Sequence, residues 1–235
     1  MRFILVLFFL VSSLCCKDDS LFLGSLEETE ELPKRQKTFK NRSIQENKTP
    51  LKLLLDGNTR YTEGHLLHPH ESRARRLNLS QSQHPFAIII TCADSRVVPE
   101  IMFDQGIGDL FVIRVAGNII DEAVLGSIEY AVEHLNVKLI MVLGHERCGA
   151  VTAALTGKKD TSNILFIANH IKPAIERAKR KAGNLLDNSV RENVIESVEQ
   201  IKKDQNIIAD AFKHGDVRVV GARYDLDDGK VEVIY

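Results

Sequence analysis

Three side chains that can bind a metal ion, Cys92, His145 and Cys148, occur in two short segments of the sequence. Cys92 begins the segment CADSR (residues 92–96), and the other two lie three residues apart in GHERCGA (residues 144–150). Two thiolates and one imidazole are a typical ligand set for Zn²⁺, and three protein ligands leave a fourth tetrahedral position open to water. The pattern therefore predicts a catalytic rather than a structural zinc site.

Each segment directly follows an apolar run that is typical of a buried strand. Residues 86–91 (FAIIIT) precede Cys92, and residues 139–143 (LIMVL) precede the second segment. Because open parallel sheets bind ligands beyond the carboxyl ends of their strands, the three side chains should converge if these two strands are neighbours. A lone H-x-x-C, or a single buried cysteine, would more often be incidental.

Strands and helices alternate through the rest of the sequence from about Leu51 onward. The pattern predicts further strands at 110–115, 217–222 and 231–235, and helices at 121–135, 164–182 and 187–201. Strand-helix-strand units build parallel sheets. We therefore predict an α/β fold with a mainly parallel central sheet flanked by helices.

The two segments resemble the metal-binding signatures of the β-class carbonic anhydrases. The resemblance extends from about Leu51 to Tyr235 and includes DQGIGDLF (104–111), RVAGN (114–118) and SIEYAV (127–132). It implies a zinc-dependent lyase, with one Zn²⁺ per subunit, that interconverts carbon dioxide with bicarbonate and a proton. It also implies a homodimer or a higher even oligomer. A carbonyl sulfide or carbon disulfide hydrolase on the same fold is a close alternative, because the ligands do not distinguish these substrates.

The resemblance also implies roles for five further residues. Asp94 pairs with Arg96 and accepts a hydrogen bond from the hydroxide on the zinc, and in some members this carboxylate becomes a fourth ligand in a closed state. Gln83 matches a glutamine that donates a hydrogen bond to the substrate. Phe111 and Tyr130 match aromatic residues that line the pocket, part of whose wall a second subunit is expected to supply. From the residues alone, Gln83 could instead cap a turn and both aromatic residues could belong to the core.

Two positions depart from the family pattern. Glu146 and Arg147 stand where small or hydroxylated residues are common in the family, so the rim of the pocket is expected to differ here.

A non-catalytic protein is a further alternative. Two cysteines in an oxidising compartment commonly form a disulfide, so Cys92 and Cys148 could be bonded to each other. Alternatively, they could close a structural zinc site.

The first 50 residues differ in composition from the rest of the chain. Residues 3–14 are apolar, too short to span a bilayer but of the length of a signal-peptide core. We therefore predict that residues 1–16 are a signal peptide or a lipoprotein signal, with Cys15 or Cys16 as the lipid acceptor. The polar residues 17–50 form a predicted tether, and 51–235 form the predicted zinc domain. The protein is thus expected in the periplasm or anchored in the cell envelope.

The overall charge argues against a polyanionic partner. Lys and Arg number 31 and Asp and Glu number 32, which gives a formal net charge of -1. Such a chain has no general field that attracts nucleic acid. A nucleotide-binding module is also disfavoured, because no G-x-G-x-x-G follows a predicted strand.

Overall fold

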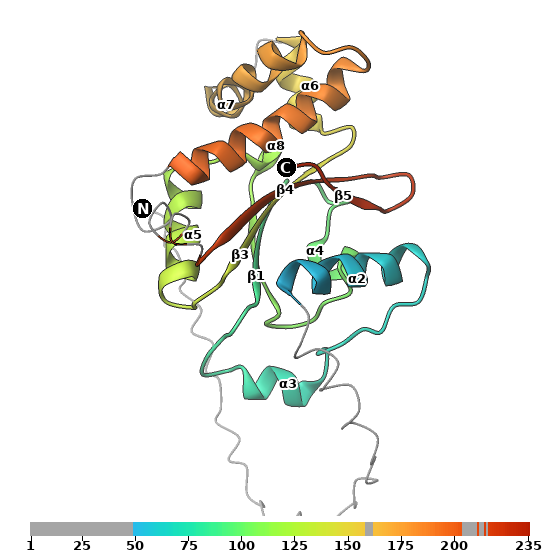
Figure 1. Ribbon diagram of the computed structural model, residues 1–235, viewed down its shortest axis with the longest axis vertical. Helices are drawn as coiled ribbons and strands as arrows, with labels where there is room; N and C mark the ends of the chain where they lie inside the picture. The colour runs from blue at the N-terminus through green and yellow to red at the C-terminus, as the bar shows by residue number, and fades with distance from the viewer. Residues whose placement is uncertain (1–48, 158–161, 204–210, 212–213, 215) are drawn as a thin grey trace, which may run out of the picture. The chain divides into compact units, whose positions relative to one another are not determined.

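Five strands form one sheet in the order β2-β1-β3-β4-β5 (Figure 1). The strands are β1 (Ala87–Thr91), β2 (Leu110–Arg114), β3 (Leu139–His145), β4 (Arg218–Tyr224) and β5 (Val231–Val233). β1 to β4 run parallel, and β5 pairs antiparallel with β4. The predicted α/β fold with a mainly parallel sheet is confirmed.

The computed structural model describes residues 49–157, 162–203, 211, 214 and 216–235. The predicted signal (residues 1–16) and nearly all of the predicted tether (17–50) lie outside these residues. Within them, no helix combines the length and the apolar character needed to cross a membrane.

β1 and β3, the two neighbouring strands inside the sheet, are buried along their whole length, which explains their continuous apolar sequence. Alternate side chains of β1 enter two different cores, Ile88 and Ile90 on one face and Ala87 and Ile89 on the other. Burial of each large aliphatic side chain contributes about 1.5–3 kcal/mol, so these strands form the most strongly stabilised part of the sheet.

Helices cover both faces and the carboxyl edge of the sheet (Figure 1). α5 (Glu122–Glu133) and α8 (Leu185–Lys203) pack on one face, and α2 (Pro50–Thr62) and α4 (Pro99–Met102) on the other. Beyond the carboxyl ends of β1 and β3 lie α6 (Gly149–Thr156), α7 (Ser162–Ala178) and the short 3-10 helix η1 (Ala116–Asn118). A further short helix, α3 (Arg73–Asn78), precedes β1.

The sequence pattern identified α5, α7 and α8, although their ends differ by a few residues from the predicted ones. α3, α4 and α6 were not predicted as separate helices, because four to eight residues are too few for a clear apolar period. α5 begins where Asp121 caps it by accepting a hydrogen bond from the backbone N–H of Val124, at 2.9 Å.

The register of β1 and β3 determines where the site can form. Thr91, the last residue of β1, lies opposite Leu143, and its hydroxyl donates to the Leu143 carbonyl at 2.8 Å. Cys92 follows directly, and β3 continues for two residues to His145. The condition set by the sequence is met, because the two strands are neighbours and end at the same edge.

Candidate metal centre

Cys92, His145 and Cys148 converge at the carboxyl edge of the sheet. Their potential ligand atoms all lie within 4.8 Å of one another, and all three residues are buried. The two sulfur atoms are 3.9 Å apart, and both cysteines are free thiols. Two thiolates at about 2.3 Å from a tetrahedral zinc ion lie about 3.8 Å from each other, so this spacing fits zinc. It does not fit a disulfide, whose sulfurs lie about 2.05 Å apart.

The His145 ring is oriented for metal binding. Its Nδ1 donates a hydrogen bond to the backbone carbonyl of Glu146, at 2.9 Å. The Nε2 atom therefore carries the free lone pair. This side chain is 0% exposed, and Nε2 has no hydrogen-bond partner among the described residues. A buried nitrogen without a partner is costly, and a metal ion held with the two thiols would satisfy it.

The contact between the two thiols shifts their pKa values in opposite directions. A hydrogen bond from the Cys148 thiol lowers the pKa of Cys92, which outweighs the effect of burial, and the backbone N–H of Gly117 adds a donor at 3.3 Å. The same pairing, together with burial, raises the pKa of Cys148. The hydrogen bond between the two sulfurs thus favours the thiolate form of Cys92 and the thiol form of Cys148. Metal binding requires both cysteines to be deprotonated.

Asp94 and Arg96 form a bidentate ion pair beside the three donors. The guanidinium Nε and Nη2 donate to the two carboxylate oxygens at 2.9 and 2.8 Å, and the Arg96 backbone N–H donates at 3.0 Å. This guanidinium holds the pKa of Asp94 well below its usual range, so the carboxylate is ionised at neutral pH. Its Oδ2 lies 3.8 Å from Nε2 of His145, close enough to act on a ligand of the metal.

Two further residues support the segment that follows β1, and the sequence reasoning assigned neither a role. Arg114 donates to the backbone carbonyls of Asp94 and Cys92, at 2.7 and 3.3 Å. Gly117 has a positive φ of 70°, and a β-carbon there would lie 2.8 Å from Ile171. Both residues belong to the RVAGN segment, whose resemblance to the family was the available signal.

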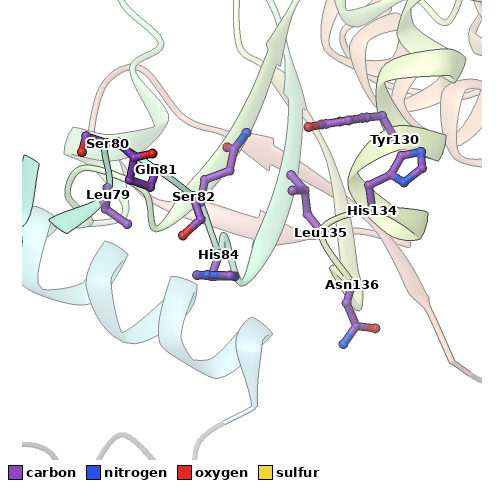
Figure 2. Close-up of a pocket in the computed structure, with 10 residues that line it drawn as sticks. Leu79, Ser80, Gln81, Ser82, His84, Tyr130, His134, Leu135 and Asn136 are labelled. Atoms are coloured by element: carbon purple, nitrogen blue, oxygen red, sulfur yellow. The ribbon is translucent and has the colours of Figure 1, made fainter. Parts of the chain in front are cut away.

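Gln83, Phe111 and Tyr130 lie together, but away from the three donors. Gln83 and Tyr130 line one pocket, and the rings of Phe111 and Tyr130 have centroids 6.3 Å apart. Figure 2 shows Tyr130 and His134 across this pocket from the segment that precedes β1. Gln83 precedes β1 whereas Cys92 follows it, and the strand alone separates its ends by about 13 Å. Within one chain, these residues do not reach the candidate metal centre.

Comparison with known proteins supports this interpretation of the site. The family model described as carbonic anhydrase matches residues 87–231, more than half of the chain. A carbonic anhydrase of Mycolicibacterium smegmatis is 44% identical over 186 residues, which cover 77% of this chain and 90% of that protein. This chain belongs to the carbonic anhydrase family. The matched residues of this carbonic anhydrase include all three donors and begin after Gln83.

Solved structures place this carbonic anhydrase in the β class. The β-carbonic anhydrase CcaA is 28% identical, with a TM-score of 0.62 over 78% of this chain and 86% of that chain. A structure from a study of two tetrameric β-carbonic anhydrases of Sordaria macrospora is 24% identical, with a TM-score of 0.61 over 68% of this chain and 85% of that chain. The second likeness concerns the fold alone.

Proposed function

We propose that this β-carbonic anhydrase reversibly hydrates carbon dioxide to bicarbonate and a proton, with one zinc ion per subunit held by Cys92, His145 and Cys148. The observation that carries the proposal is the convergence of these three buried donors, including an imidazole nitrogen that has no hydrogen-bond partner within the described part of the chain. When bound, zinc supplies hydroxide near neutral pH by lowering the pKa of water.

The protein's own contribution is to orient the nucleophile. The Asp94 carboxylate is ionised and can only accept hydrogen bonds, so it would accept one from the attacking hydroxyl group and leave a lone pair of that oxygen directed at the carbon. Arg96 fixes both carboxylate oxygens and so sets the direction of that acceptor. The surrounding apolar side chains of Ile119, Val151 and Ile171 keep the centre dry, which strengthens these electrostatic interactions.

Two substitutions separate metal binding from turnover. Cys148→Ser should lose both zinc and CO2 hydration, because a thiolate ligand is missing. Asp94→Asn should keep about one zinc per chain but lose about 100-fold or more in kcat/KM, since the amide can offer a donor in the wrong place. Stopped-flow CO2 hydration and zinc quantification on the same samples measure both. An active, zinc-free Cys148→Ser protein would contradict the proposal, and faster turnover of carbonyl sulfide or carbon disulfide than of CO2 would reassign the substrate.

We further propose that each site is completed by a second copy of the chain, in a homodimer or a higher even oligomer. Gln83, Phe111 and Tyr130 are at the far end of the strands from their own Cys92, and Tyr130 is 46% exposed. β2, which carries Phe111, is an edge strand of the sheet, and none of its side chains is fully buried. No strand among the described residues pairs with its outer edge, and exposed strand edges are usually covered or paired. In a two-fold symmetric dimer, each chain would supply Gln83, Phe111 and Tyr130 to the centre of its partner.

Mixed dimers test this arrangement. Gln83→Ala and Asp94→Asn chains are each expected to be nearly inactive alone, with about 100-fold lower kcat/KM, because each lacks one hydrogen-bonding group. If Gln83 acts on the partner's site, a dimer of one chain of each kind contains one intact site. Random assembly of equal amounts should then recover about a quarter of the wild-type activity. Mixtures that stay as inactive as their parents, although native mass spectrometry detects the mixed dimer, would show that Gln83 does not act across the interface.

We also propose that the protein is exported and held in the cell envelope or released to the periplasm. The apolar residues 3–14 followed by Cys15 and Cys16 support this proposal. Expression of the full chain with an alkyne-labelled fatty acid should label the wild type and not the Cys15→Ala/Cys16→Ala variant. An unlabelled but cleaved and exported protein would indicate release, and a full-length cytosolic protein would contradict export.

A further inference from the structure

Glu146 and Arg147, the two residues between His145 of β3 and Cys148 at the N-cap of α6, are hydrogen-bonded to the turn that joins β4 to β5. The Glu146 backbone N–H donates to the carbonyl of Tyr224 at 2.9 Å, and its carboxylate accepts from the Leu226 N–H at 3.3 Å. The Arg147 guanidinium donates to both carboxylate oxygens of Asp227, at 3.0 and 2.7 Å. The β4–β5 turn is thus hydrogen-bonded to the turn that separates His145 from Cys148.

Arg147 has a backbone conformation that its side chain disfavours. Its φ is 51°, in the left-handed region that residues with a β-carbon rarely adopt. A residue persists there only when the surrounding structure holds it. The planar, two-point pairing of its guanidinium with Asp227 is a contact of that kind, because it fixes both the position and the orientation of the group.

The acidic groups near this turn do not form a separate cation site. Carboxylate oxygens of Glu146, Asp225 and Asp227 lie within 4.8 Å of one another. Each of them faces an arginine, however: Arg147 contacts Glu146 and Asp227, and Arg223 contacts Asp225. The charges needed to bind a cation are already compensated. The geometry therefore favours a structural clamp.

We propose that the Arg147–Asp227 pair is a positioning device for the metal centre of this chain. The inference rests on the proposed zinc site. Asp227 holds Arg147 in the left-handed conformation. The conformation of Arg147 places the preceding Glu146 carbonyl, which accepts a hydrogen bond from Nδ1 of His145. The β4–β5 turn thereby sets the direction of the His145 ring and the approach of Cys148.

Zinc release provides the test. Zinc-loaded Asp227→Asn should lose its metal to a chelator about two- to fivefold faster than the wild type, a modest factor because the pair is largely solvent-exposed. Asp228→Asn is the matched control, since this neighbouring aspartate pairs with Lys230 instead, at 2.7 Å. Its release rate should equal that of the wild type. In cobalt-substituted protein, the visible spectrum should shift in Asp227→Asn and stay unchanged in Asp228→Asn, which a general loss of stability would not produce.

A double-substitution cycle makes the inference sharper. Glycine adopts the left-handed region without penalty, so in an Arg147→Gly background Asp227 is no longer needed to hold residue 147 in that conformation. Asp227→Asn should then add no further change in release rate or in the cobalt spectrum. Equal release from Asp227→Asn and wild type, or an undiminished effect of Asp227→Asn in the Arg147→Gly background, would overturn the inference and leave the zinc site in place. A wild-type chain that binds no zinc would overturn the proposed function as well.

Discussion

The pairing of β1 with β3 is the constraint on which the rest of the structure depends. Because Thr91 lies opposite Leu143, the chain leaves both strands at the same edge, and the next few residues of each segment face one another. A register shift by one residue would reverse the face of every side chain on the strand and would separate Cys92 from His145. The two cores on either side of the sheet hold this register, because alternate residues of both strands are committed to different faces.

The same edge explains why the three donors are already arranged to bind a metal ion before it arrives. Two thiols and an imidazole are buried together, with one nitrogen left without a hydrogen-bond partner among the described residues. Burial of such groups costs free energy, which the stable central strands offset. The hydrogen bonds to the Cys92 sulfur, from Cys148 and from the Gly117 N–H, lower the pKa of that thiol. The Asp94 carboxylate, held in place by Arg96, lies beside these donors as a hydrogen-bond acceptor.

The donors and the strands that position them could be predicted from the sequence because each depends on local patterns. Continuous apolar runs indicated β1 and β3, and the residue types directly after them indicated zinc. The predicted strand at 86–91 already placed Gln83 and Cys92 at opposite ends. Which metal centre Gln83 would serve depends on contact with a second chain, and no local pattern specifies that contact. The link between Arg147 and Asp227 joins residues 80 positions apart, so no local pattern contains it.

Zinc K-edge X-ray absorption on the metal-loaded wild-type protein tests the central claim most directly. Two sulfur neighbours at about 2.3 Å, one imidazole nitrogen and one further light atom at about 2.0–2.1 Å are the predicted coordination sphere. His145→Ala should lose the imidazole contribution and retain the sulfur shell. A sphere without sulfur, one with four sulfurs, or an imidazole signal that persists in His145→Ala would contradict the assignment of Cys92, His145 and Cys148 as the ligands.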